Sequence, residues 1–229
     1  SIMPLPENED EWSKLNIVFI TKLGKIRKNN LDDFRNIQSN GKIAMKLDKN
    51  DEIVSVKLIK GDEDIMINSY FGKSLRVNNN KIRLFKGRSS KGVKGINLKN
   101  KDKVISLSIL NKNLISSNKD EMKSREQFIL TITENGYGKR SSSYEFRETG
   151  RGGQGIINIS TSERNGNVSA SFPINSEDEI MLVTNKGQMI RVKVSEIRVA
   201  GRNTQGVRIF KTENEEKVVT AVRLADSNG

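Results

Sequence analysis

Positively charged side chains recur at fixed places in this sequence, and such side chains bind phosphate and other anions. Four similar segments each carry a cation four residues after a turn glycine: Lys28, Arg76, Arg140 and Arg191. Three of them carry an arginine four residues before a second glycine: Arg88, Arg151 and Arg202, with Ile37 in the first segment. Both patterns predict a stripe of charge along one rim of the fold, where it would contact a polyanion.

Other cations flank these positions and belong to the same candidate site. They are Lys91, Lys94, Lys139, Lys193 and Arg208. The alternative interpretation is that lysine and arginine cover the solvent face of strands and discourage edge pairing. Recurrence in every segment, on a chain with 40 Lys+Arg against 28 Asp+Glu and a net charge of +12, favours the binding interpretation.

One stretch, T-G-R-G-G-Q-G-I-I-N-I at 149–159, combines an arginine with four glycines. Its spacing matches G-x-G-x-x-G, but a dinucleotide site needs a helix after the glycines and the residues here predict a strand. A disordered arginine-glycine tail is also disfavoured, because the stretch falls in register with the other second-glycine corners. We therefore interpret Arg151, Gly152, Gly153, Gln154 and Gly155 as a tight turn that presents Arg151 beside exposed backbone N–H groups.

The elements that must position these cations form an internal repeat. Apolar runs rich in isoleucine and valine precede the turn glycines Gly24, Gly72, Gly136 and Gly187, and the second glycines are Gly41, Gly92, Gly155 and Gly206. The period is about 50 residues, which corresponds to about four short strands per repeat. We expect an all-β, propeller-like domain of four blades, in which neighbouring blades stack because a single blade cannot cover its own faces.

The repeat pattern also gives the expected organisation of the chain. The whole of 1–229 is expected to form one domain, with repeats near 15–60, 61–110, 127–175 and 176–226. Residues 111–126 are polar and predict an inserted surface loop. Residues 1–14, including the acidic run at 7–11, predict the end of a preceding blade or a linker.

Composition excludes several kinds of chemistry. The chain has no cysteine and no histidine, which excludes disulfides, zinc sites built from these residues and histidine-dependent catalysis. No window has the length and apolarity of a spanning helix, and no secretory signal is visible. We expect a cytoplasmic protein without metal or catalytic residues of its own.

Several segments resemble the family of DNA gyrase A C-terminal domains. They are R-N-T-Q-G-V (202–207), N-G-Y-G-K-R (135–140) followed by R-G-G-Q-G, and the four turns. The resemblance covers nearly the whole chain. It implies a β-pinwheel, in which blades exchange strands, that wraps double-stranded DNA without sequence readout and so supports ATP-dependent negative supercoiling by a type IIA topoisomerase. The implied partners are the rest of gyrase A and the gyrase B protein in an A2B2 holoenzyme, and ATP and Mg²⁺ belong to those other parts.

The chain departs from this family in two respects. Family members have about six blades and a Q-R-R-G-G-x-G box in the first, whereas this sequence shows four repeats and only the shorter R-G-G-Q-G at 151–155. We therefore expect a fragment without the first blades. Three alternatives remain: the related domain of topoisomerase IV, which positions DNA without comparable wrapping, a propeller that binds proteins, and a propeller hydrolase that uses paired carboxylates.

Overall fold

The computed structural model describes residues 3–36, 40–112 and 118–224, and most of its regular structure is β-strand. The strands are β1 (Asn16–Thr21), β2 (Lys25–Asn30), β3 (Ile53–Ile59), β4 (Asp64–Ser69), β5 (Lys73–Asn78), β6 (Leu84–Phe85), β7 (Val93–Lys94), β8 (Val104–Leu110), β9 (Phe128–Thr133), β10 (Tyr137–Ser142), β11 (Glu148–Thr149), β12 (Ile156–Ile157), β13 (Val168–Ile174), β14 (Glu179–Thr184), β15 (Met189–Lys193), β16 (Val207–Arg208) and β17 (Val218–Leu224). The expected all-β fold is confirmed.

Short helical turns lie between the strands. They are the 3-10 helices η1 (Glu9–Lys14), η2 (Leu31–Phe34), η3 (Asn79–Lys81), η4 (Ser143–Glu145) and η5 (Val194–Glu196), and the α-helix α1 (Lys119–Ser124). Four of the five 3-10 turns follow the second strand of a hairpin, so the turn recurs with the repeat. No helix in the described part of the chain is long and apolar enough to cross a membrane.

Each repeat contributes a hairpin whose turn requires a glycine. Gly24, Gly72, Gly136 and Gly187 have φ between +75° and +86°, a conformation that costs other residues energy. The hairpin pairs the first strand with the second, as in β1 and β2, where Val18 lies opposite Lys28. The third strand of the repeat pairs with the other edge of the first, as β3 does with β1.

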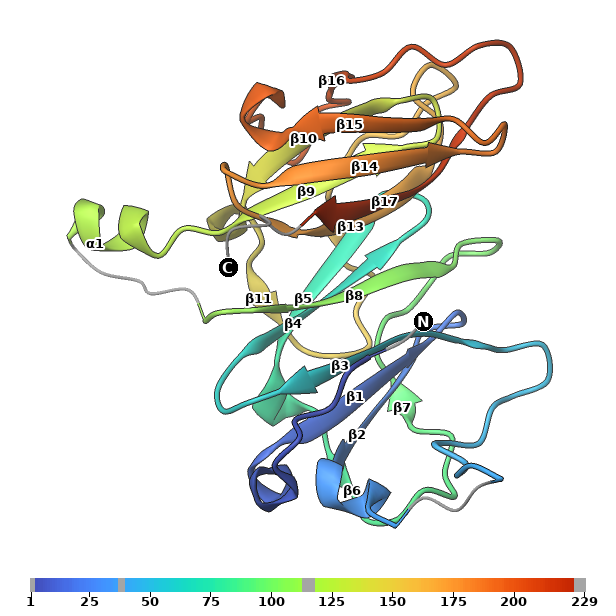
Figure 1. Ribbon diagram of the computed structural model, residues 1–229, viewed down its shortest axis with the longest axis vertical. Coiled ribbons are helices and arrows are strands. Elements are labelled where there is room, and N and C mark those ends of the chain that lie inside the picture. Colours follow the sequence, from blue (N-terminus) through green and yellow to red (C-terminus); the bar gives the residue numbers. More distant parts are fainter. Residues whose placement is uncertain (1–2, 37–39, 113–117, 225–229) are drawn as a thin grey trace. The chain divides into compact units, whose positions relative to one another are not determined.

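Strands are exchanged between consecutive repeats. The four sheets have the orders β3-β1-β2-β6, β11-β5-β4-β8, β13-β9-β10-β16 and β15-β14-β17, and β7 and β12 pair with β2 and β5. The short strands β6 and β7 of the second repeat therefore complete the sheet of the first repeat, β6 in parallel and β7 antiparallel. The sheet order within each repeat can be followed in Figure 1. This exchange confirms the expected pinwheel arrangement.

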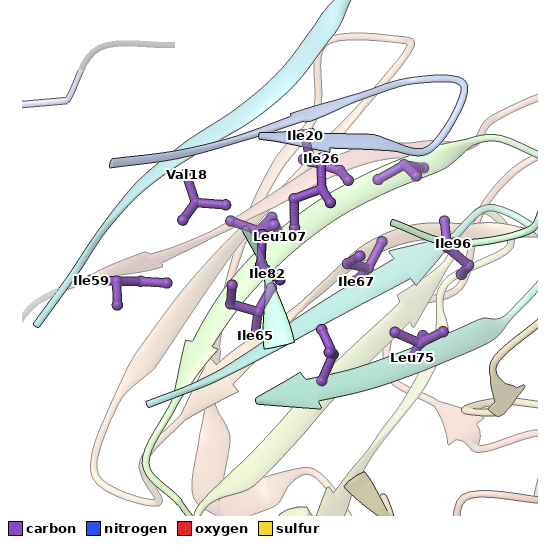
Figure 2. Close-up of a cluster of buried hydrophobic side chains, with 12 residues drawn as sticks. Val18, Ile20, Ile26, Ile59, Ile65, Ile67, Leu75, Ile82, Ile96 and Leu107 are labelled. Carbon is purple, nitrogen blue, oxygen red and sulfur yellow. The ribbon is translucent and has the colours of Figure 1, made fainter. Parts of the chain in front are cut away.

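The chain divides into two compact units, which are described separately. The first contains Ser1–Ile67, Leu75–Lys112 and Glu148–Gly155, and the second contains Asn68–Ser74, Asn113–Arg147 and Ile156–Gly229. In the first unit, side chains from β1, β2 and β3 pack against side chains from β4, β5 and β8, and Figure 2 shows Val18, Ile20 and Ile26 near Ile65, Ile82 and Leu107. Sheets of consecutive repeats thus share one core.

The second unit has an equivalent core. Leu130 and Ile132 of β9 pack with Ile180 and Leu182 of β14, and all four side chains are fully buried. Side chains of β13 and β17 complete this cluster. Because apolar residues from two sheets are needed to bury one another, stacking of neighbouring repeats supplies the hydrophobic stabilisation.

Two segments outside the strands have their own structure. Residues 9–14 form η1, and its Trp12 is buried in a separate cluster with Phe19 and Phe34 of the first unit. Part of the expected loop at 111–126 forms helix α1, whose N–H groups at Asp120 and Glu121 donate to the Asn118 side chain. This helix of six residues is too short to create an apolar period in the sequence. Residues 113–117 of that loop, and 225–226 of the fourth repeat, lie outside the described residues.

Candidate nucleic-acid interface

The first series of predicted site residues divides by burial. Lys28 and Arg76 are 6% and 2% exposed, and Arg140 is 8% exposed, whereas Arg191 is exposed. The predicted surface stripe at this position is therefore wrong for three of its four members. Each of the three side chains is held by protein acceptors.

Lys28 and Arg140 bind the 3-10 turn of the following repeat. The ammonium of Lys28 donates to the carbonyl oxygen and side-chain oxygen of Asn79, at 2.8 and 2.9 Å. Arg140 donates to the Ile197 carbonyl at 2.7 Å and to the Ser195 carbonyl at 3.4 Å. Both cations therefore hold the 3-10 turn of the following repeat against the strand that carries them, and they donate to acceptors that are removed from water.

Arg76 of the second repeat has a different buried partner. Its Nε donates to Oδ2 of Asp64 on β4, and its Nη2 donates to the Asn111 carbonyl at 2.9 Å. The prediction that this series of cations lies on a charged rim is therefore wrong for Arg76 as well. Lys28 and Arg140 satisfy buried acceptors of the following repeat, whereas Arg76 satisfies buried acceptors that flank strands of its own repeat.

A second buried series lies one residue earlier on the same strands. Lys139 is fully buried on β10, and its ammonium donates to the Gly201 carbonyl at 2.5 Å. Arg27 occupies the equivalent place on β2 and donates to the carbonyls of Gly87, Arg88 and Ser90. Burial lowers the pKa of Lys139 to about 8. Arg27 was not among the predicted site residues, although a cation stands three residues after the turn glycine in two repeats.

The second series of predicted residues has a repeating contact of its own. Arg88 donates through Nη1 to the Ile43 carbonyl at 2.9 Å, and Arg151 donates in the same way to the Lys94 carbonyl at 3.4 Å. Arg202 donates to the Ile157 carbonyl at 3.1 Å. Each acceptor lies two residues after the second glycine of the preceding repeat. We call these three side chains the loop arginines; Ile37, the corresponding residue of the first repeat, lies outside the described residues.

The loop arginines remain able to bind another acceptor. Arg151 is exposed, and Arg88 and Arg202 are half-buried. A guanidinium group has five N–H donors, and the contact to the preceding repeat uses only Nη1. Arg202 also donates from Nη1 to the Asn203 side chain, which lies in the same loop. The carbonyl contact therefore holds each guanidinium in place and leaves its Nε and Nη2 donors for another acceptor.

The glycine-rich turn differs in detail from the prediction. Gly152 and Gly155 have positive φ, and β12 follows them, so a helix-based nucleotide site is excluded. The Gly152 N–H donates to the Gly95 carbonyl at 2.6 Å, and the Gly153 carbonyl accepts from Asn97. The Gly152 N–H is therefore occupied and does not lie free beside Arg151. Gln154 is exposed at this turn.

The flanking cations are all exposed except Lys139, and some of them have partners. Lys91 forms an ion pair with Asp48 at 2.6 Å, and Arg191 pairs with Glu179. Lys94 and Lys193 are exposed and form no side-chain ion pair with the described residues. Arg208, on β16, donates to the hydroxyl of Tyr137 at 2.8 Å. An unpaired exposed cation is the better phosphate ligand, because no ion pair must be broken first.

Three glutamates lie at a pocket in the second unit. One of them, Glu216, accepts from the Thr184 hydroxyl and the Glu213 N–H. These hydrogen bonds lower the pKa of Glu216, which opposes a role as a general acid. No group of three or more acidic residues in the described ranges could hold a metal ion.

These features define a class of protein: an all-β repeat protein that exchanges strands between blades and carries fixed arginines on its exchanged loops. A family model described as the DNA gyrase C-terminal domain, beta-propeller, matches residues 15–60, 64–111, 127–175 and 178–225. The chain belongs to this family.

Curated relatives agree with this assignment. The DNA gyrase A protein of Rickettsia prowazekii is 42% identical over 264 residues, which cover 100% of this chain and 29% of that protein. The gyrase A protein of Salmonella typhimurium is 38% identical, over 99% of this chain and 24% of that protein. The chain thus spans about three tenths of the length of the first relative.

Two solved structures share the fold. The DNA gyrase A C-terminal domain aligns with a TM-score of 0.78 and 23% identity, over 97% of this chain and 73% of that one. The C-terminal domain of DNA topoisomerase IV aligns with a TM-score of 0.84 and 22% identity, over 96% and 64%. At this identity both comparisons support the fold alone.

Proposed function

We propose that this chain binds and wraps double-stranded DNA without sequence specificity, as part of a gyrase that introduces negative supercoils using ATP. The observation that carries the proposal is the repeated contact of the loop arginines with the carbonyl of the preceding repeat. This contact holds arginines at equivalent places on successive exchanged loops. Guanidinium groups held at the same place in each repeat can bind phosphates of a DNA backbone.

The charge of the chain supports the same function. A net charge of +12 on 229 residues attracts DNA, and the buried cations account for only some of it. The proposed contacts are the loop arginines with the exposed Lys91, Lys94, Arg191, Lys193 and Arg208. Lys28, Arg76, Lys139 and Arg140 support the loops from inside, and we assign them no contact with DNA.

The proposed role is non-catalytic and depends on other parts of the enzyme. The remainder of gyrase A and the gyrase B protein would supply DNA cleavage and ATP hydrolysis, with their Mg²⁺, in an A2B2 assembly. This chain needs no cofactor for backbone contacts made by cations. The proposed place of action is the cytoplasm, on the nucleoid.

Binding is tested with a labelled linear duplex at several salt concentrations. Each phosphate contact contributes about −0.9 to the slope of log affinity against log salt. Replacing all three loop arginines with glutamine should therefore make this slope shallower by about 2.7. The matched control replaces Lys119, Lys123 and Arg125, exposed cations at helix α1, with glutamine. An equal loss of slope in both triple variants would contradict the proposed site, and a wild-type chain without salt-sensitive binding would contradict the function.

Wrapping is tested by topology. A closed circular plasmid is relaxed by a nicking-closing enzyme in the presence of the chain, and the change in linking number is measured. A positive change that grows with protein concentration is expected if these four repeats bend DNA with the required hand. Salt-sensitive binding without any change in linking number would contradict wrapping by this chain.

One alternative that the sequence left open is the role of the topoisomerase IV domain, which shares this fold. In that alternative the chain positions DNA without wrapping it. The topological experiment separates the two, because positioning predicts binding with an unchanged linking number.

A further inference from the structure

An aromatic residue in the second unit holds two arginines beside each other. Tyr137 begins β10 and is 4% exposed. The guanidinium carbons of Arg164 and Arg208 lie 5.1 and 5.4 Å from the centroid of its ring. Arg208 is brought there by strand exchange, because β16 pairs with β10 and places Arg208 opposite Tyr137.

Both arginines also point donors at the tyrosine hydroxyl. Arg208 donates from Nη2 at 2.8 Å, and Arg164 donates from Nε at 3.3 Å. The phenolic oxygen therefore accepts from two cations, and its own proton has no acceptor among the described residues. A hydroxyl whose proton has no partner can donate to an acceptor that approaches it.

The charges at this place are not neutralised. No carboxylate of the described residues lies within 4.0 Å of either guanidinium, whereas Lys25, the residue of the first repeat that corresponds to Tyr137, pairs with Asp48. Hydrogen bonds from Arg164 and then Arg208 lower the pKa of the Tyr137 phenol, which makes its O–H a stronger donor. Two guanidinium groups and one acidic hydroxyl together present donors for a single tetrahedral oxyanion.

There is space for such a ligand. A surface pocket of about 380 Å³ is lined by Tyr137, both arginines and Lys211. Glu213, Glu215 and Glu216 also line it. Glu216 accepts from the Thr184 hydroxyl and the Glu213 N–H, and Glu213 Oε2 lies 3.8 Å from Lys186 Nζ. None of these glutamates forms an ion pair with Arg164 or Arg208, so both arginines can bind an anion that enters the pocket.

We propose that Tyr137, Arg164 and Arg208 form a phosphate-binding clamp that holds one phosphodiester group of bound DNA. This inference rests on the proposed function, and it adds Arg164 and Tyr137 to the contacts. The loop that carries Arg202 continues into β16, so one exchanged segment would contact the DNA backbone at two places. Tyr137 sets the separation of the two guanidinium groups and donates the third hydrogen bond.

Two variants test the clamp on the full chain. Replacing Arg164 and Arg208 with glutamine should reduce the slope of log affinity against log salt by about 1.8. Tyr137→Phe keeps the ring and removes the hydroxyl, so affinity should fall about tenfold at constant salt while the slope stays nearly unchanged. The matched control replaces Lys123 and Arg125 with glutamine, which removes two exposed charges at helix α1. Circular dichroism checks that every variant is folded.

The outcomes separate the clamp from the proposed function. If the wild-type chain binds duplex DNA and the clamp variants lose no more than the control, the clamp is overturned and DNA binding stands. If the wild-type chain binds no duplex, inorganic phosphate is titrated instead and the arginine Nε–H signals are followed by NMR. Shifts of the Arg164 and Arg208 signals that disappear in Tyr137→Phe would support an oxyanion site of another use, and unshifted signals would overturn it.

Discussion

Arg76 and Asp64 form an ion pair inside the first unit, on neighbouring strands of the second repeat. Arg76 Nε lies 2.7 Å from Asp64 Oδ2, and the two side chains are 1% and 2% exposed. A cation that matched the repeated site pattern in the sequence therefore has a carboxylate as its partner. Because both groups are buried, removing either charge leaves the other in a site that water cannot reach, without the opposite charge beside it.

This pair predicts a large loss of stability on breaking it. Asp64→Asn should lower the free energy of unfolding by about 3–5 kcal/mol, because the Arg76 charge stays buried without its partner. The measurement is urea unfolding, with Glu52→Gln as the control, since Glu52 pairs with Lys22 at 2.7 Å on the surface. The control should cost less than about 1 kcal/mol. Equal costs for the two variants would show that the pair does not support the fold.

Strand exchange predicts that two turn glycines tolerate alanine differently. An alanine Cβ at Gly136 would meet the Phe210 carbonyl of the exchanged chain, whereas nothing lies within 4 Å of the same position at Gly187. Both have positive φ, which costs about 1–2 kcal/mol for alanine. Gly136→Ala should add an overpacking cost of about 1–3 kcal/mol. Thermal unfolding of both variants measures this difference, and a similar loss in both would argue against close approach of the exchanged chain.

We expect DNA binding to become stronger when the ion-pair partner of Arg191, Glu179, is neutralised. It is exposed but paired with Glu179, so it must leave an ion pair to bind phosphate. Glu179→Gln should release it and steepen the slope of log affinity against log salt by about 0.9. Glu177→Gln removes the same charge from an exposed neighbour and serves as the control. If both variants gain affinity equally, the effect is one of net charge and Arg191 is not a specific contact.

We expect the free energy of unfolding to depend on pH because of Lys139. Its pKa is lowered from 10.5 to about 8 by burial, so between these values the unfolded chain binds more protons at this group than the folded chain. The contribution of Lys139 to the free energy of unfolding therefore rises with pH through that window. Below about pH 8 the free-energy cost of burying the charged ammonium is fully present. The full rise in the free energy of unfolding from this group, across the whole window, is about 3 kcal/mol.

The test compares wild type with Lys139→Met by urea unfolding from pH 7 to about 10.5. The variant should lack the rise in stability that the wild type gains across this window. Parallel curves for the two proteins would mean that the pKa of Lys139 is not lowered in the folded chain.

The repeat itself could be predicted from the sequence because its signals are local. Turn glycines such as Gly24 and Gly136 follow short isoleucine-rich runs at a regular period, and positive φ makes glycine necessary at those turns. The stacked cores also follow, since the apolar strands of one repeat need another surface to cover them. The exchange of β6 and β7 into the preceding sheet was available only through resemblance to a family.

The candidate site was predictable in part. Exposed Arg151 and the half-buried Arg88 and Arg202 stand where the repeat places them, on equivalent exchanged loops. Arg164 escaped notice, because it lies near Tyr137 only through folding of loops that are distant in sequence. Its only sequence signal was one arginine in a polar turn.

The sequence by itself determined the four repeats, the strand and turn positions, and a strong positive charge, because these depend on neighbouring residues and composition. Only the tertiary structure decided which cations face water. Arg140 and Arg151 are both arginines beside repeat glycines, but Arg140 is buried against carbonyls of the following repeat and Arg151 is exposed. The physical reason is that burial depends on which chain segment packs over a strand, and strand exchange brings that segment from the next repeat.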